Sequence, residues 1–405
     1  MPSQESYRDV LLRVIDEVIA PGAASVDVSG SFPGEQVGAL AKAGLLALTV
    51  PAEFGGGGAG PRAAADVVRE LGAVCGSTAM VVTMHYAAVA ALAAAGDGGT
   101  LAAVAAGTHL STLAFSETGS RSHFWAPLST AVPAGDGTVR LDAVKSWVTS
   151  AGQADSYVWS SRPLAGGADR PDGADGPDGA AGPDGADGAA GASGPMTLWL
   201  VPAGADGLSV AGTFDGLGLR GNSSAPMAAN GVRVPLTAML GADGAGLDLA
   251  LAAVLPVFLI CSAAMSAGLM RRLAEETAAH LADTRLAHLG VSLAQQERPR
   301  AQLARLRIEA DRAWAHIGET LDAVESGRED ALLLVLEVKA AAGEAASDAA
   351  DLALRAGGGA AFRKESVVER LFRDSRAARV MAPTTEALHD FIGRALLGQP
   401  LLGEA

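Results

Sequence analysis

The stretch TVRLDAVKSWVTSAGQADSYVWSSR, residues 138–162, decides the fold of the chain. It holds two runs rich in β-branched and aromatic residues, separated by a segment that contains Gly and Asp, and such runs are typical of a pair of β-strands. Similar short runs occur at 111–117, 196–203 and 227–235. Together these segments predict a small β domain in the middle of the chain.

The segments on both sides of this β domain are predicted to be helical. Residues 6–110 carry apolar residues three and four positions apart, and the same period returns in long amphipathic segments from residue 247 onward, as expected for helices that bury one face. Four or five long helices with short connections predict an antiparallel bundle. We therefore expect an α+β protein with an N-terminal α-helical domain (1–110), a middle β domain that forms a barrel or a sandwich (111–240), and a C-terminal four-helix bundle (241–405).

A low-complexity segment interrupts the predicted β domain. Residues 166–195 consist almost entirely of Gly, Ala, Asp and Pro, a composition that cannot bury enough apolar surface to offset the entropy of ordering. Because the segment lies between two predicted strands, we expect a disordered hairpin loop over 163–195. The Asp residues from Asp169 to Asp187 make calcium binding the alternative, but their spacing does not match a calcium loop, and we expect no metal site.

Composition and charge exclude several functions. The net charge of −15 argues against nucleic acid as a partner, because phosphate binding needs clustered Lys and Arg. Cys75 and Cys261 have neither metal-ligand nor disulfide-framework spacing and fit a cytoplasmic protein; the N-terminus also lacks signal-peptide features. The uncharged run 249–270 is long enough to span a bilayer. It is rich in Ala, Ser and Gly and contains Pro256, so we expect a buried bundle helix and no membrane partner.

Five segments, in order along the chain, carry a recognisable set of motifs. They are a Gly-rich loop, a strand followed by a turn, a Lys-x-Trp-x-Thr strand pair, a segment similar to a Gly-x-Arg-x-Ser motif and a late bundle motif. The segments are LLALTVPAEFGGGGAG (45–60), LAFSETGSRSHFWAPLSTAV (113–132), LDAVKSWVTSAGQADSYVWSSR (141–162), GLGLRGNSSAPMAANGVRVP (216–235) and GGGAAFRKESVVERLFRDSRAARVM (357–381). This series, together with the α, β, α order, resembles the acyl-CoA dehydrogenase flavoproteins over nearly the whole chain.

The resemblance implies non-covalent FAD, bound between the middle domain and the C-terminal bundle of a homodimer or homotetramer. It implies an acyl thioester or another small substrate, and an electron-transfer partner. Phe115 and Ser116 would lie beside the isoalloxazine ring, and Ser122 would lie in the turn that faces flavin and thioester. Trp147 would cover one face of the ring as a flat apolar wall, and Thr149 would bond its edge. A core aromatic on a strand is the alternative for Trp147.

The family also contacts FAD across a subunit boundary. The best matches for those contacts are Arg285, Gln296, Gly357 and Gly358. The match at Arg285 is degraded, since RLAHLG is one residue too long and lacks the family's Phe. A plain surface arginine is therefore the alternative at this position.

The catalytic base that the resemblance implies is missing. In the stretch RVMAPTTEAL, the Glu of the family's Glu-Gly-Thr motif falls on Ala382. Thr384 and Glu386 would still belong to the FAD clamp, although Thr384 is also a good N-cap for a helix. The second place where some family members carry a base, near 257–259, has no carboxylate either.

Three hypotheses follow from the missing base. The first is a dehydrogenase that acts on the CH–CH group of an acyl-CoA or acyl-carrier-protein thioester, with a displaced acid as base and Glu117 as the candidate. The second is a flavin-dependent monooxygenase or oxidase of the same fold, which needs no thioester base. The third is a catalytically silent subunit whose partner chain supplies the base.

Overall fold

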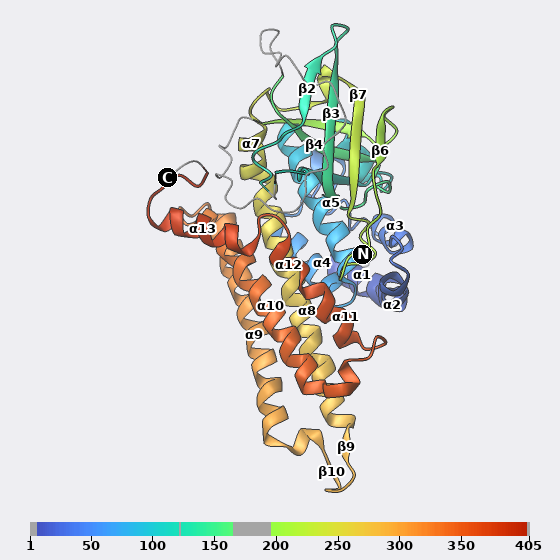
Figure 1. Ribbon diagram of the computed structural model, residues 1–405, viewed down its shortest axis with the longest axis vertical. Coiled ribbons are helices and arrows are strands. Elements are labelled where there is room, and N and C mark those ends of the chain that lie inside the picture. The colour runs from blue at the N-terminus through green and yellow to red at the C-terminus, as the bar shows by residue number, and fades with distance from the viewer. Residues whose placement is uncertain (1–5, 121–122, 165–195, 403–405) are drawn as a thin grey trace, which may run out of the picture.

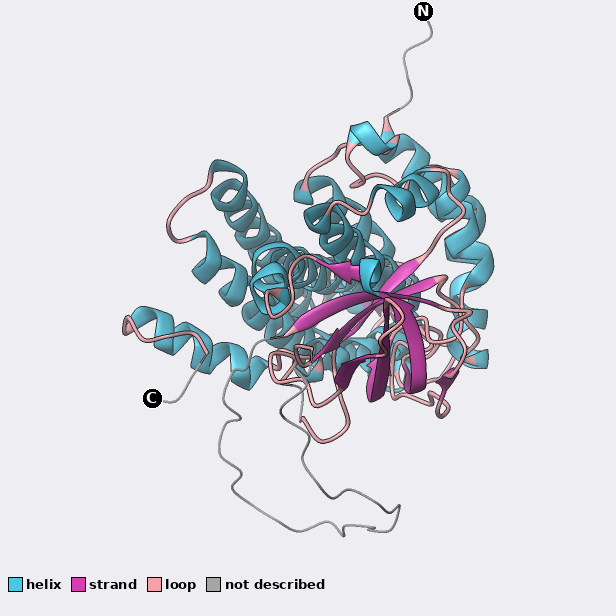
Figure 2. Cartoon of the chain, turned by 90° about the horizontal axis from the view of Figure 1, so that it is seen from above, coloured by secondary structure: helices cyan, strands magenta, loops and turns pink. Residues whose placement is uncertain are grey.

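The computed structural model describes residues 6–120, 123–164 and 196–402. The loop predicted over 163–195 falls almost wholly outside the described residues. The strands gather at one end of the molecule, and the long C-terminal helices extend away from them to the other end (Figure 1). Viewed from above, the strands lie together, with helices beneath and beside them (Figure 2).

The N-terminal part is helical, as its apolar period predicts. Its elements are α1 (Tyr7–Val14), η1 (Ile15–Ile19), α2 (Ala20–Ser29), α3 (Gly34–Lys42), η2 (Ala52–Phe54), α4 (Pro61–Gly72), α5 (Gly76–Ala95) and α6 (Gly98–Ala105). Ser6 and Asp97 cap α1 and α6 by accepting from the backbone N–H groups of Asp9 and Thr100, which satisfies donors that a helix start leaves free. Helix α5 is the central element, because it packs against α4, α8 and β1 and buries most of its side chains.

The β domain consists of two four-stranded sheets. Its strands are β1 (Ser111–Ala114), β2 (Thr130–Pro133), β3 (Thr138–Val148), β4 (Ser156–Ser161), β5 (Thr197–Pro202), β6 (Leu208–Val210), β7 (Ala225–Pro235) and β8 (Met239–Leu240), with a 3₁₀ turn η3 (Leu236–Ala238). The strand orders are β1-β4-β5-β8 and β2-β3-β7-β6, and the β1–β4 pair is parallel. Over the described strands the closed barrel that we allowed for is not formed. An isolated bridge joins Glu117, which follows β1, to Lys145 of β3.

The C-terminal part forms the expected four-helix bundle. Helices α8, α9 and α10 pack on one another, and α11 packs on α8 and α10. The elements are α7 (Gly246–Leu249), η4 (Ala250–Val254), α8 (Leu255–Asp283), β9 (Arg285–Leu286), β10 (Val291–Ser292), η5 (Leu293–Gln295), α9 (Glu297–Ser326), α10 (Ala331–Ala361), α11 (Val367–Ser375), α12 (Ala377–Val380) and α13 (Thr385–Leu396). The β9–β10 hairpin lies at the end of the bundle that is remote from the β domain (Figure 1).

Glycine allows α4 and α8 to touch backbone to backbone. A Cβ atom on Gly268 would lie 2.0 Å from the carbonyl oxygen of Arg69, and one on Gly72 would lie 2.7 Å from that of Met265. Neither distance is compatible with a side chain, so these two positions set how closely the N-terminal domain packs on the bundle.

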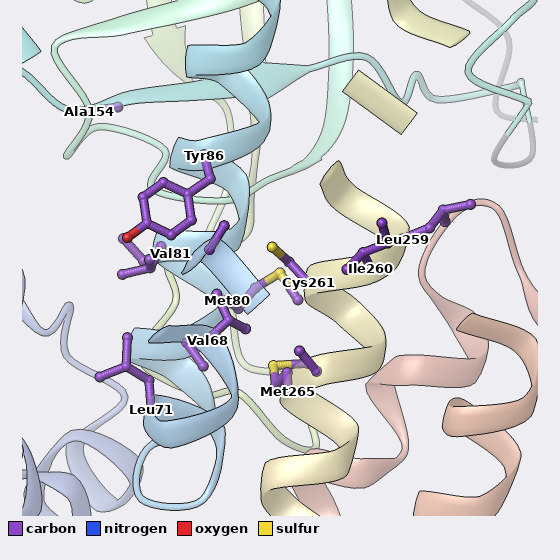
Figure 3. Close-up of a cluster of buried hydrophobic side chains, with 14 of the residues drawn as sticks. Val68, Leu71, Met80, Val81, Tyr86, Ala154, Leu259, Ile260, Cys261 and Met265 are labelled. Atoms are coloured by element: carbon purple, nitrogen blue, oxygen red, sulfur yellow. The ribbon is translucent and has the colours of Figure 1, made fainter. Parts of the chain in front are cut away.

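The uncharged run 249–270, which was predicted to be a buried helix, lies in a helix that is mostly buried. Among the described residues, α5 and the continuous segment Gly246–Asp283 are long and apolar enough to cross a membrane by length and composition alone. In their most apolar windows, however, 72% and 67% of the residues are buried inside the protein. Figure 3 shows Met80 of α5 facing Cys261 and Met265 of α8, so the apolar surface is used for helix packing.

Candidate active site

Two neighbouring cavities lie where the β domain meets the helices. The larger has a volume of about 500 Å³ and is lined from α5, β3, the 214–224 segment, α8, α11 and α12. The smaller has a volume of about 80 Å³. The two share part of their walls, namely Met84, Ser116, Trp147, Phe258 and Ala382.

Trp147 projects into both cavities because β3 is irregular at this point. The pairing of β3 with β7 shifts between Lys145 and Val148, and Trp147 has a φ of 56°. Strict alternation from the buried Lys145 would place Trp147 on the buried face, but the bulge reverses the direction of its side chain. As a result 67% of Trp147 is exposed. A flat aromatic surface thus faces the cavity with no partner from the described chain covering it.

Three hydroxyl and aromatic side chains predicted for the site are also present at the cavity walls. Phe115 lines the smaller cavity, Ser116 lines both, and Thr149 lines the larger one. The Thr149 hydroxyl lies 2.9 Å from that of Ser224, another wall residue. Ser122, the remaining member of this predicted set, lies outside the described residues.

Glu117, the candidate base, lies in a closed network behind the wall. Its carboxylate is 2.5 Å from the Nζ atom of Lys145, and it accepts hydrogen bonds from the amides of Leu128 and Ser129 at 2.6 and 2.9 Å and from the Ser129 hydroxyl. Lys145 also donates to the carbonyl and hydroxyl oxygens of Ser160 at 2.7 and 2.8 Å. Both side chains are almost fully buried, and Glu117 is not among the residues that line either cavity.

The electrostatics of this pair also argue against a catalytic base. Burial would raise the pKa of Glu117, but the charge of Lys145 and the hydrogen bonds together hold that pKa below its ordinary value. Burial lowers the pKa of Lys145 to about 8, against the opposing effect of the Glu117 charge. A carboxylate with a low pKa and its acceptor sites already filled is a poor proton acceptor. The geometry therefore assigns Glu117 to the support of β1 and β3.

The corner between α12 and α13 carries Ala382, the position predicted to correspond to the family's base. Ala382 lines both cavities and Pro383 lines the smaller one. Thr384 is the N-cap of α13, as predicted, and its side chain accepts from the amide of Ala387 at 3.3 Å. Glu386 is exposed, with its carboxylate 3.9 Å from Arg379. Neither Thr384 nor Glu386 lines either of the two cavities.

The residues predicted to reach a neighbouring subunit lie apart from the cavities. Arg285 belongs to β9 and is exposed, and Gln296 precedes α9. Gly357 and Gly358 lie in the last turns of α10, where Gly358 leaves the helical conformation with a φ of 55°. The β9–β10 hairpin is at the far end of the bundle (Figure 1), so the chain does not bring Arg285 to its own cavities.

A second cluster was missed from the sequence. Arg373 lines the larger cavity and forms bonds of 2.6 and 2.8 Å with Asp27 of α2 and with Glu369 of α11. The neighbouring Asp374 accepts from the amide of Leu219 at 2.7 Å, and burial raises its pKa to about 6. The signal was available in the RLFRDSR part of the late bundle motif, but Asp27 and Leu219 are 346 and 155 residues away from their partners.

The charged side chains at the cavity walls are arginines, one of which, Arg373, is already paired with Asp27 and Glu369. Among the described residues that line either cavity, the charged side chains are Arg373 and Arg376, and no carboxylate or histidine is present. The Nε atom of Arg376 is buried without a hydrogen-bond partner. A flat apolar wall at Trp147 and the cationic side chain of Arg376 at the wall of the larger cavity fit a flat aromatic cofactor that carries negative charge. The described residues contain no group of three or more His, Cys, Asp or Glu side chains that could hold a metal ion.

Two helical domains and a two-sheet β domain that together enclose such a cavity fit the class of flavin-dependent oxidoreductases expected from the motifs. Comparison with known proteins identifies the family within it. The model of the acyl-CoA dehydrogenase N-terminal domain matches residues 1–100, and the model of the C-terminal domain matches residues 244–397. The chain therefore belongs to the acyl-CoA dehydrogenase family, whose members are FAD-dependent oxidoreductases, as the motifs predicted.

Individual relatives agree with this assignment over nearly the full length. The chain is 26% identical to a probable acyl-CoA dehydrogenase of Bacillus subtilis, over 97% of this chain and 98% of that protein. It is 27% identical to the human mitochondrial short-chain specific acyl-CoA dehydrogenase, over 92% and 84% of the two chains. The butyryl-CoA dehydrogenase structure from Megasphaera elsdenii has a TM-score of 0.84 at 20% identity, over 98% of this chain and 100% of that chain.

Proposed function

We propose that this chain is an FAD-dependent oxidoreductase that acts on the CH–CH group of a short acyl thioester of coenzyme A or a carrier protein. The observation that carries the proposal is the indole of Trp147, which is turned out of β3 into a cavity of about 500 Å³. A ring system of isoalloxazine size would cover this surface. FAD, when bound, supplies the hydride acceptor.

The residues of the chain would then bind the flavin ring and orient it toward the substrate. Trp147 provides the apolar wall against one ring face. Ser116 and Thr149, whose hydroxyls are at the wall, would hydrogen-bond the polar edge of the ring, and Arg376 would face negative charge. Phe258 and Ala382 line both cavities and would exclude water from the space between ring and substrate.

The smaller cavity supports a short acyl group. It is lined almost wholly by apolar side chains, including Leu113, Phe124 and Phe258. A cavity of about 150 Å³ holds one benzene molecule, so the 80 Å³ available here would hold roughly half as many carbons. We therefore infer an acyl chain of about three or four carbons.

The candidate functions differ in whether the reaction needs a catalytic base and in which chain supplies it. No carboxylate is present among the described lining residues, and this observation favours oxygen chemistry, as in a flavin-dependent monooxygenase or oxidase, over α-proton removal. Alternatively, the chain is a silent subunit whose partner chain supplies the base. We keep dehydrogenation as the proposed function because the family match extends over both helical domains.

The assembly is proposed from the same resemblance, and the location from the two separated cysteines, Cys75 and Cys261. Arg285, Gln296, Gly357 and Gly358 are remote from the chain's own cavities and would contact the FAD of a second copy in a homodimer or homotetramer. Thr384 and Glu386 would complete the clamp around the cofactor. An electron-transferring flavoprotein would reoxidise the flavin, and the protein would work in the cytoplasm.

An anaerobic titration tests the proposal. The purified protein, saturated with FAD, is mixed with butyryl-CoA, palmitoyl-CoA and butyryl carrier protein, and the visible flavin band is followed. We expect butyryl thioesters to bleach the band and palmitoyl-CoA to leave it unchanged. If no thioester bleaches it, but the chemically reduced protein consumes oxygen and oxygenates a substrate, the oxygen alternative replaces the dehydrogenase. A protein that takes up no FAD would overturn the flavin assignment.

A further inference from the structure

Lys339 is a buried lysine that reaches the backbone of the α12–α13 corner. It lies on α10 and is only 1% exposed. Its Nζ atom donates to three carbonyl oxygens, those of Pro383 at 2.7 Å, Met381 at 3.0 Å and Ala378 at 3.2 Å. An ammonium group has three N–H donors, so all of them are used.

The hydrogen bonds to these carbonyl groups offset part of the cost of burying the ammonium charge of Lys339. Among the described residues no carboxylate forms an ion pair with Lys339, whereas the other fully buried lysine, Lys145, is paired with Glu117. A buried charge without hydrogen bonds would be strongly unfavourable. The α12–α13 corner and Lys339 therefore stabilise each other, and each requires the other to stay in place.

The segment that Lys339 holds is a wall of the cavities. Val380, Met381 and Ala382 line the larger cavity, and Ala382 and Pro383 line the smaller. The segment lies between the end of α12 and the start of α13, where the helical hydrogen-bond ladder is interrupted. The ion pair at this corner, between Arg379 and Glu386, is long and exposed and contributes little.

We propose that Lys339 is a positioning residue that holds the Met381–Pro383 backbone against α10 and thereby sets where Ala382 stands relative to the flavin and substrate. This role rests on the proposed function only in naming what fills the cavities. The anchoring itself is independent of it.

The protonation of Lys339 makes this anchor depend on pH. Burial lowers its pKa to about 7, while the charge of Glu386 on α13 opposes the shift. Glu386 is the charged group that acts on Lys339 among the described residues, and Arg379 on α12 lies beside that carboxylate. Because this pKa lies below the ordinary value, a corner that opens and exposes Lys339 to water takes up a proton above about pH 7, and opening becomes less favourable as the pH rises.

The test compares Lys339→Met with the matched control Ser347→Ala in the FAD-loaded protein. Ser347 is buried on the same helix, and its hydroxyl bonds only to Gly343 within that helix at 3.2 Å. Amide hydrogen exchange of the segment 376–388 is measured together with flavin reduction by butyryl-CoA. For Lys339→Met we expect exchange of this segment to rise about tenfold or more, the effect of one lost charged hydrogen bond. Exchange in the β domain should be unchanged, and Ser347→Ala should change neither region.

The kinetic result separates positioning from general stability. Flavin reduction in Lys339→Met should slow about tenfold at saturating substrate with less change in KM, because the corner is misplaced rather than the acyl site removed. Unchanged exchange over 376–388, or an equal rise in all segments, would overturn the proposal. If flavin reduction fails in the unaltered protein as well, only the proposed function is at fault.

The unaltered protein supplies a second test that does not depend on the variant folding. Exchange over 376–388, corrected for the intrinsic rate, is compared between pH 6 and pH 8.5. We expect protection of this segment to rise several-fold across this range in the unaltered protein, because Lys339 is neutral in the closed corner above about pH 7 and takes up a proton when the corner opens, and protection of α8 to stay constant. Constant or falling protection at 376–388 would refute the titrating anchor.

Discussion

Replacing Glu117 by Gln distinguishes a structural carboxylate from a catalytic one. The change removes the negative charge 2.5 Å from Lys145 and leaves a cation on a side chain with no exposure. Breaking a buried ion pair on one side costs about 3–5 kcal/mol. The amide of Gln still accepts hydrogen bonds, and Lys145 can release its proton, so we expect the lower value, about 3 kcal/mol.

The assay is urea unfolding followed by tryptophan fluorescence. Trp159 and Trp199 are fully buried in the β domain, next to the Glu117 network, and report its unfolding. With a urea dependence near the upper end of the usual range, about 3 kcal/mol per molar, the midpoint should fall by about 1 M. Lys145→Met with Glu117→Leu should be less destabilised than Lys145→Met alone, because no buried charge is left.

The activity of folded Glu117→Gln is the decisive comparison. A general base contributes roughly a hundredfold or more to the rate, whereas a structural carboxylate should leave flavin reduction within about twofold at temperatures where the variant is folded. A hundredfold loss of rate with an unchanged urea midpoint would refute our reading of the network. The pH dependence has a definite sign, since the folded pKa of Glu117 lies below its ordinary value. Its contribution to stability is complete above about pH 4.5 and is lost as the pH falls through the folded pKa.

Three further predictions address the cavities. Ala382→Glu should raise the rate of flavin reduction by butyryl-CoA at least about a hundredfold if only the base is missing; an unchanged rate in anaerobic stopped flow would show that the cavity does not bind acyl thioesters productively. Phe258→Ala should shift the preference from butyryl-CoA toward octanoyl-CoA by about tenfold in kcat/KM, since each additional buried methylene contributes about 0.8 kcal/mol, and equal losses for both esters would contradict the assigned acyl site. Trp147→Ala should weaken FAD binding about tenfold or more in equilibrium dialysis, while Leu128→Ala, outside the cavities, should leave it unchanged.

The order of helical and β segments could be predicted from the sequence because hydrophobic period is a local property. Apolar spacing in 6–110 and after 247 indicated helices, and β-branched runs around 138–162 indicated strands. The choice between barrel and two open sheets could not be made, because it depends on which strands pair over long separations. The side-chain direction of Trp147 could not be predicted either, because a single bulge reverses it and no residue pattern marks the bulge.

The candidate site shows the same division. Phe115, Ser116, Trp147 and Thr149 were predicted from motifs, and the structure places all four at the cavity walls. Their contacts with flavin remain predictions. The sequence could not show that the carboxylate of Glu117 is already bound. Its partners, Leu128, Ser129 and Lys145, lie on other strands and loops. Lys339 was missed because its partners are backbone carbonyl groups, which leave no trace in residue identity.

The cavity is completed by residues that are far apart in the order of synthesis. Its first wall residue is Met80 and its last is Ala382, and Arg373 ties the late helix α11 to Asp27 near the start of the chain. During translation the apolar surfaces of α5 and β3 therefore emerge long before the helices that cover them. Cofactor capture is confined to the end of synthesis, and a chain that stops before α12 would expose Trp147 and the flank of α5 to chaperones instead of to FAD.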